Sequence, residues 1–188
     1  MFKSLSIICL TALPLLAACA SAPEERIAVP RAQTTEKQRI AYATVALRNV
    51  SLPTYAAGEA IFTADETGRL RDNGGLLWAD DPSRAMTLEL ARHLTGITGA
   101  RVASEPWPFL DPAAAEVEIR VEDMLARADG TFQFSGQYFV TSEEGRDRAR
   151  LFDLTTPVAG ERTPADLADA RARLVRDLAL DVVQRGLK

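Results

Sequence analysis

The feature that most constrains the fold is a run of three strand-like stretches, over residues 116–125, 131–141 and 148–154, joined by short polar connections. In the first stretch apolar and charged side chains alternate, so one face of the strand is buried and the other faces water. Connections this short join antiparallel neighbours, whereas parallel strands need a long crossover. Gly136 interrupts the second stretch and indicates a bulge. The sequence therefore predicts an antiparallel meander with one buried face.

Two long helices are predicted, one before and one after this meander. The first is expected over residues 81–95, with Asp81 as the N-cap and a proline in the first turn. The second is expected over residues 163–186, where Thr163 caps the helix and Asp166 places a carboxylate in the first turn. Each helix carries an apolar stripe, and these stripes must pack on the sheet.

Further strands are expected before the first helix. Residues 41–50 are rich in β-branched and aromatic side chains, and residues 60–64 and 69–72 flank a turn-rich connection that fits a hairpin. Together with the meander, these elements predict an α+β two-layer sandwich, with a mainly antiparallel sheet of about six or seven strands and two long helices.

The N-terminus has the pattern of a bacterial lipoprotein signal. Lys3 supplies the positive start, residues 5–16 the apolar middle, and Ala17 and Ala18 the small residues that precede cleavage before Cys19. The apolar stretch is shorter than the roughly 20 residues of a membrane-spanning helix. Diacylglycerol on the Cys19 sulfur and an acyl chain such as palmitate on its amine would anchor the mature protein stably. An ordinary secretory signal followed by a buried cysteine is the alternative.

The chain therefore divides into a signal peptide (residues 1–18), a lipidated N-terminus and tether (19–39) and a single α+β periplasmic domain (40–188). Both cysteines lie within the first 19 residues, so a disulfide cannot hold the domain. The tether would have a coil dimension of roughly 25 Å, although residues 27–29 could pair as a short edge strand. Ala20 follows the cysteine where an Asp would be the inner-membrane retention signal, so outer-membrane delivery is expected.

Composition and motifs argue against several functions. The net charge is −4 and the arginines are spread along the chain, so nucleic acid is not expected as a partner. The sequence has no Gly-rich phosphate loop and no serine nucleophile elbow, and His93 is its single histidine. His93 is interpreted as a half-buried residue beside an apolar stripe, and Glu116 and Glu118 as part of a solvated strand face. No enzyme activity, cofactor or metal site is predicted.

Two aromatic residues lie in a proline-restricted segment between the first helix and the meander. Trp107 stands between Pro106 and Pro108, and Phe109 follows directly. Two interpretations remain open at this point: the segment presents an apolar contact to a partner, or Trp107 folds back as a lid over the core. Trp78, which has apolar neighbours, is predicted to be buried.

Several of these pieces, in this order, resemble one family. They are the lipobox at Cys19, the strand that ends in residues 52–55 (Leu-Pro-Thr-Tyr), residues 77–80 (Leu-Trp-Ala-Asp) entering a helix, and Pro106 with Trp107 before the meander. The chain is similar to the ABC-type transport auxiliary lipoproteins, also called PqiC-like or YmbA-like lipoproteins. Many relatives have an aromatic strand soon after the lipidated cysteine, where this chain offers only the residues at 27–29.

The resemblance implies a non-catalytic periplasmic domain held at the outer membrane by its lipid. It further implies a partner, a substrate-binding protein of the mammalian-cell-entry (MCE) type, sometimes with an inner-membrane ABC transporter, in lipid movement and membrane integrity. Trp107 and Phe109 are the candidate contacts with that partner, and a homo-oligomer is a further option. The alternative function is an independent envelope lipoprotein that binds a small amphiphile between sheet and helices, which would need an open apolar pocket of several hundred Å³.

Overall fold

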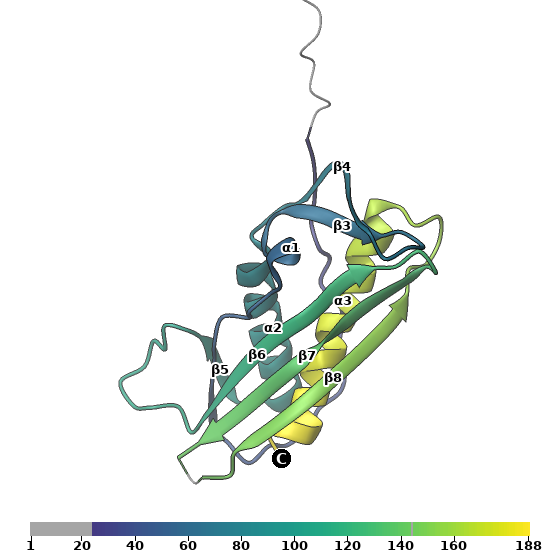
Figure 1. The fold of residues 1–188 in the computed structure, drawn as a ribbon. Coiled ribbons are helices and arrows are strands. Elements are labelled where there is room, and N and C mark those ends of the chain that lie inside the picture. The colour runs from purple at the N-terminus through teal and green to yellow at the C-terminus, as the bar shows by residue number, and fades with distance from the viewer. Residues whose placement is uncertain (1–23, 144) are drawn as a thin grey trace, which may run out of the picture.

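The structure, a computed structural model, describes residues 24–143 and 145–188. A single sheet forms one layer, and two long helices cover one face of it (Figure 1). The sheet is dominated by β6 (Ala115–Ala126), β7 (Thr131–Ser142) and β8 (Arg148–Pro157), and the helices are α2 (Pro82–Thr98) and α3 (Pro164–Asp181). The signal peptide and Cys19 lie outside the described residues.

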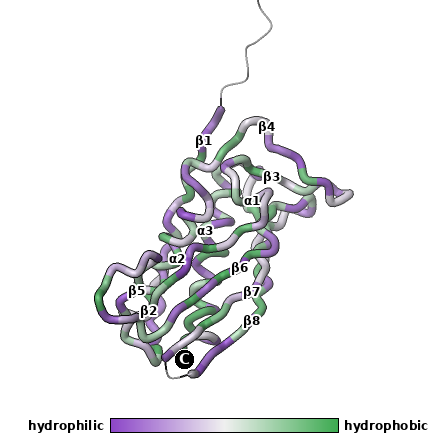
Figure 2. Tube along the Cα trace, turned by 60° about the vertical axis from the view of Figure 1, so that its left-hand side comes forward, coloured by the Kyte–Doolittle hydropathy of each residue, from purple (hydrophilic) through white to green (hydrophobic). Residues whose placement is uncertain are grey.

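The predicted meander is confirmed. β6, β7 and β8 pair antiparallel in chain order, and Figure 2 shows hydrophobic and hydrophilic residues alternating along them. The register of β6 and β7 shifts between Val121 and Asp123, opposite Gly136. A Cβ atom at Gly136 would lie 2.3 Å from the carbonyl oxygen of Arg120, which real side chains do not allow. Gly136 is therefore required where the two backbones approach most closely at this bulge.

Both helix starts are confirmed. The Asp81 carboxylate accepts a hydrogen bond from the Arg84 amide at 2.7 Å, and Thr163 and Asp166 form a reciprocal capping box. The expected end of the first helix is wrong by one turn, because Gly96 is helical and Gly99 ends the helix with a left-handed φ of 71°. A π-helical turn, η1 (Val182–Gly186), extends α3.

The expected sheet is corrected: over the described residues it has eight strands and is mixed, not mainly antiparallel. A further helix, α1, is short (Thr54–Ala57). Of the smaller strands, β3 (Ala60–Ala64) and β4 (Leu70–Trp78) form the expected hairpin, whereas β2 (Thr44–Leu47) and β5 (Arg101–Ser104) pair in parallel. The free edge of β6 is shared, because β2 pairs with its first residues and β3 with its last, both in parallel. Long connections, including α2, return the chain in the same direction and so produce these parallel pairs.

The segment expected as a tether belongs in part to the fold. Residues Glu25–Ile27 form β1, which pairs in parallel with β4, and the Ala79 amide donates to the Ile27 carbonyl at 2.8 Å. Further along, the amide of Gln38 donates to the Ile97 carbonyl at 2.9 Å. The edge strand that the sequence left open therefore exists, two residues earlier than expected. The tether expected over residues 19–39 is therefore shorter at its C-terminal end, because β1 and Gln38 already bond to the domain.

Candidate functional site: the two ends of the domain

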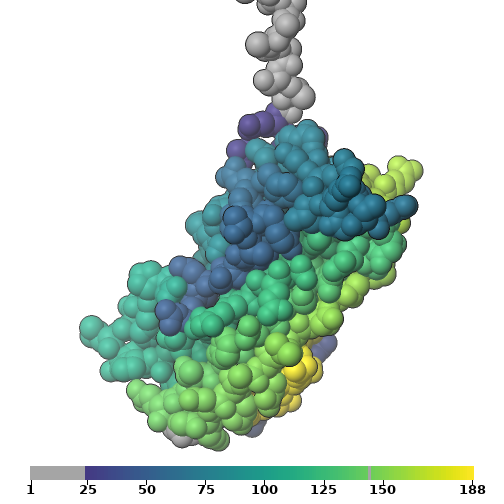
Figure 3. All heavy atoms as spheres, in the orientation of Figure 1, coloured from purple at the N-terminus to yellow at the C-terminus, as the bar shows by residue number. Residues whose placement is uncertain are grey.

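The loop of residues 105–114, between β5 and β6, carries the predicted aromatic contact. In the space-filling view it protrudes from the lower left of the molecule (Figure 3). Trp107 is partly exposed, Phe109 is 41% exposed, and Leu110 is fully exposed. Apolar side chains presented in this way are typical of a contact surface rather than of a core.

Hydrogen bonds hold both ends of this loop. At its start, the Glu105 amide donates to the Leu47 carbonyl at 2.9 Å, and the Glu105 carboxylate accepts from the Asn49 amide at 2.9 Å. At its end, the Ala114 amide donates to the hydroxyl of Thr44 at 2.8 Å. The base of the loop is therefore tied to β2 and the residues after it, and its tip projects from a fixed position.

Within the loop the two aromatic rings pack on each other. The ring centroids of Trp107 and Phe109 lie 4.9 Å apart at 68°, an edge-to-face arrangement, and the Arg101 guanidinium lies 5.0 Å from the centroid of Phe109. The indole N–H of Trp107 donates to the Asp111 carbonyl at 2.8 Å. A hollow of about 340 Å³ adjoins Trp107, between Pro112 and the ends of β6 and β7. Trp107 thus packs on its own loop and does not fold back as a lid over the core.

The loop and the N-terminal strand lie at opposite ends of β6. Ala115, which follows the loop, pairs with Val45, whereas Ala126 pairs with Thr63 of β3, the neighbour of β4 and so of β1. At about 3.3 Å per residue, these two ends are separated by roughly 36 Å. In Figure 1 the first described residues, drawn in purple, accordingly lie at the end of the molecule far from this loop.

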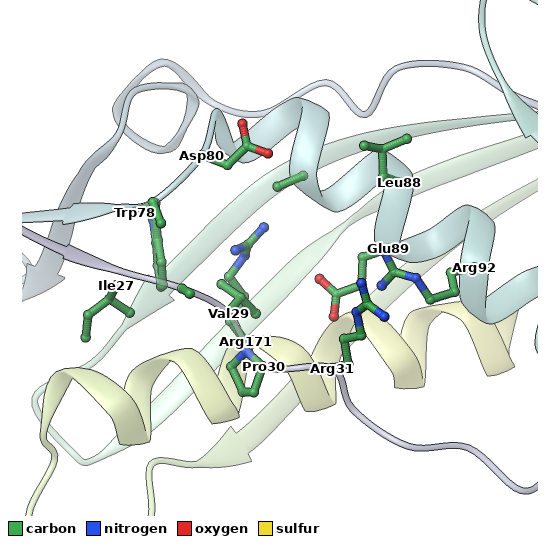
Figure 4. Close-up of a pocket in the computed structure, with 13 residues that line it drawn as sticks. Ile27, Val29, Pro30, Arg31, Trp78, Asp80, Leu88, Glu89, Arg92 and Arg171 are labelled. Carbon is green, nitrogen blue, oxygen red and sulfur yellow. The ribbon is translucent and has the colours of Figure 1, made fainter.

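A pocket of about 240 Å³ lies beneath the N-terminal segment. Residues 27–31, which we call the strap, form one wall, and the end of β4, α2 and Arg171 of α3 form the others. Figure 4 shows Arg171 between Trp78 and Glu89. The arginine is only 2% exposed, and its guanidinium carbon lies 5.0 Å from the centroid of the Trp78 ring. Trp78 itself is 3% exposed, which confirms its predicted burial.

Arg171 is the residue of this pocket that sequence reasoning missed. Its Nε and Nη2 atoms are buried and have no hydrogen-bond partner. Burial lowers the pKa of the guanidinium, and the nearby carboxylates of Glu89 and Asp80 oppose that shift. The signal was present in the sequence, because Arg171 lies one helical turn from Leu167 and one from Leu174, on the apolar stripe itself.

His93 is also more buried than expected, and Glu89, one helical turn before it, is buried with it. The imidazole Nε2 of His93 lies 3.8 Å from Oε1 of Glu89, and neither atom has a hydrogen-bond partner. His93 is only 5% exposed, so the predicted half-buried position is corrected. The reason is the contact between α2 and α3, which covers the edge of the α2 stripe where His93 lies.

The remaining acidic residues behave as the sequence indicates. Glu116 pairs with Arg48 at 3.3 Å and Glu118 with Arg120 at 2.7 Å, all on the exposed strand face. Asp80 pairs with Arg84 on the first turn of α2. These carboxylates therefore serve a solvated surface and a helix start.

The sequence between residues 26 and 183 matches the family model of the ABC-type transport auxiliary lipoprotein component. The chain belongs to this family. As an ABC-type transport auxiliary lipoprotein it has an auxiliary role associated with transport, and the family is not one of enzymes. Within the described residues, none of the helices is long and apolar enough to cross a membrane.

Two crystal structures have the same fold as this auxiliary lipoprotein. One, of an uncharacterized protein, has a TM-score of 0.71 at 18% identity and covers 86% of this chain and 97% of its own. The other, from Xanthomonas campestris and assigned to the DUF330 family, has a TM-score of 0.68 at 15% identity, covering 86% of this chain and 94% of its own. No curated protein matches the sequence significantly.

Proposed function

We propose that this auxiliary lipoprotein is a non-catalytic adaptor of an ABC/MCE-type lipid transport system of the cell envelope. In this proposal, acyl chains on Cys19 hold it to the periplasmic face of the outer membrane, and the loop with Trp107 and Phe109 docks an MCE-type substrate-binding protein. Loss of the adaptor would weaken the integrity of the membrane.

The observation that carries the proposal is the placement of the two ends. Glu24, the first described residue, is five positions after Cys19, so an anchor at Cys19 holds the end of the domain that bears β1 close to the membrane. Five extended residues span at most about 18 Å. The loop with Trp107 and Phe109 lies at the opposite end of β6 and would therefore face the periplasm. A partner that reaches across from the inner membrane would meet this loop first.

The packing between sheet and helices favours an adaptor over an amphiphile carrier. Apolar side chains from α2, α3 and the strands form one continuous buried cluster there, which includes Leu90, Ile119, Phe134 and Leu178. The pocket under the strap is smaller than the several hundred Å³ that an amphiphile needs, and it lies at the side of this cluster.

Site-directed photocrosslinking in intact cells tests the docking end. A photoreactive amino acid at Leu110, which is fully exposed at the tip of the loop, should crosslink to the MCE-type protein. The matched control is Leu70, which is 40% exposed in the β3–β4 hairpin at the other end of the domain. A crosslink from Leu70 and none from Leu110 would reverse the proposed orientation, and no crosslink to an MCE-type protein from either position would contradict the choice of partner.

A further inference from the structure

The pocket under the strap contains a buried positive charge, two of whose nitrogens have no hydrogen-bond partner. A guanidinium stays protonated at any pH at which a protein is folded, so Arg171 is a buried cation. Removing such a charge from water costs several kcal/mol unless hydrogen bonds and an opposite charge compensate it. Here the compensation is incomplete: the Glu89 carboxylate is nearby and the face of Trp78 lies 5.0 Å away, but two of the nitrogens have no hydrogen bond.

The two unbonded nitrogens of Arg171 define what would complete the site. Nε and Nη2 lie on the same edge of the guanidinium, and their N–H groups point in parallel. This edge is the fork that binds two oxygens of one carboxylate or phosphate. Arg31 and Arg92 line the same pocket, so an anion there would meet more than one guanidinium. A tetrahedral phosphate can present oxygens to several sides at once, whereas a planar carboxylate serves one edge.

Glu89 adds a second requirement to any ligand. Its Oε1 atom is buried and unbonded, and its carboxylate lies on the side of Arg171 away from Trp78 (Figure 4). A simple anion bound at Arg171 would be repelled by this carboxylate. A ligand that also carries an ammonium group would instead pair with it and would supply the missing donor to Oε1. A ligand that satisfies both side chains must therefore carry a phosphate and an ammonium group in one small molecule.

We infer that this pocket is a binding site for a phosphoethanolamine group, with the phosphate on the Nε–Nη2 edge of Arg171 and the ammonium on Glu89. A volume of about 240 Å³ admits a headgroup and excludes acyl chains. The apolar side chains of the strap and Trp78 would contact the two carbons between the charges. This inference does not require the transport role; only a membrane source of the ligand rests on the proposed anchoring at Cys19.

The strap is the part of the site that must move when the ligand enters. It lines the pocket together with Arg171, whose Nε and Nη2 atoms are closed to water. The strap is held at its start, where Arg26 pairs with Glu59 at 2.7 Å and the Ile27 carbonyl accepts from Ala79 at 2.8 Å. The next backbone bond of this segment to the domain in the described part of the chain is that of Gln38. The residues between these two points can therefore shift without breaking β1.

Tryptophan fluorescence of the full-length protein in a neutral maltoside detergent tests the site. The chain has two tryptophans, so the Trp107→Phe variant leaves Trp78, in the pocket wall, as the only emitter. Glycerophosphoethanolamine should change its emission saturably. Glycerol phosphate and ethanolamine, each of which carries one of the two charges, should bind at least about tenfold more weakly.

Two variants of the pocket decide whether the response comes from the proposed contacts. Arg171→Met fills the same space without charge, so it should stay folded and lose the response. Glu89→Gln should weaken the binding of glycerophosphoethanolamine about tenfold while leaving that of glycerol phosphate unchanged or tighter. The control is Arg48→Met, which removes an exposed arginine of the outer strand face and should leave the response intact.

The source of the group is tested with nanodiscs. If phosphatidylethanolamine nanodiscs change the Trp78 emission and phosphatidylglycerol nanodiscs do not, the ligand is a lipid headgroup; a response to the soluble ester alone assigns a free phosphoethanolamine ester. No saturable response to either form up to ~10 mM would overturn the inference. A response that survives in both Arg171→Met and Glu89→Gln would do the same, and neither outcome touches the photocrosslinking test of the docking loop.

Discussion

The two tryptophans of the chain lie at opposite ends of the domain and in opposite environments. Trp78 ends β4, where β1 pairs with it on one side and its amide donates to the Glu59 carbonyl at 2.8 Å on the other. Trp107 lies in a loop that hydrogen bonds tie to the domain at its base. The same side chain is therefore core at one end, at 3% exposure, and surface at the other.

The two ends of the domain therefore differ in how many structural elements contact each other there. The end of the domain that contains Trp78 is where the N-terminal segment, β4 and both long helices meet. A substitution there disturbs contacts among several elements. At the end of the domain that contains Trp107, the rings of Trp107 and Phe109 pack on each other within one loop. A substitution there should leave the sheet and helices intact.

Cys19→Ala should yield uncleaved or unanchored protein that is lost from the outer membrane, and should leave the domain folded. No cysteine follows Cys19 in the sequence, so its replacement removes no disulfide from the domain. The measurement is fractionation of the envelope after a high-salt wash, with circular dichroism of the released protein. Retention in the outer membrane would show that the anchor is not the lipid and would remove the reason to place the Trp78 end near the bilayer.

Trp78→Ala should lower the free energy of unfolding by about 3–5 kcal/mol, as expected for an aromatic side chain removed from a core. It would open a cavity under the strap and leave the Arg171 guanidinium without the ring that covers it. Urea denaturation followed by circular dichroism measures the loss. A cost below ~1 kcal/mol would mean that the strap end is not part of the core.

Trp107→Ala should change the free energy of unfolding by less than about 1 kcal/mol and yet weaken capture of the MCE-type partner. The side chain contributes little to the core, and its loss exposes only the ring of Phe109. Denaturation and co-purification from solubilised envelopes separate the two effects. The combination of a cost near 3–5 kcal/mol and unchanged capture would instead make Trp107 a structural residue.

The smallest effect is expected at the tip of the β3–β4 hairpin. The Asp65 carboxylate accepts hydrogen bonds from the Thr67 hydroxyl and from backbone and side-chain donors in the same turn. These bonds lower the pKa of Asp65 to about 2. Because the folded-state pKa is depressed, these bonds stabilise the hairpin above the unfolded-state pKa near 4, and they are lost as the pH falls toward 2. Carboxyl chemical shifts measured by NMR between pH 5 and 1.5 would show this titration; a midpoint near 4 would contradict it.

Features that depend on neighbouring residues were predicted from the sequence, and contacts between distant segments were not. The meander, the N-caps at Asp81 and Thr163 and the bulge at Gly136 depend on neighbouring residues and turn chemistry, and they were predicted correctly. The parallel pairs were not predicted, because β2 and β5 are four residues each and lie more than fifty positions apart. The end of α2 was misplaced because Gly96 is tolerated within a helix, whereas Gly99 has the left-handed φ that ends it.

The long strands, both helix starts and the lipobox pattern could be recognised in the sequence, because each of these depends on residues within a few positions of one another, whereas the exposure of Trp107 could not. Only the tertiary structure decided that β1 closes over Trp78 and that Arg171, Glu89 and His93 are buried together. Their burial depends on where α2 and α3 cross and on what the N-terminal segment covers. Local spacing carries no information about those contacts, since they join residues from three separate parts of the chain.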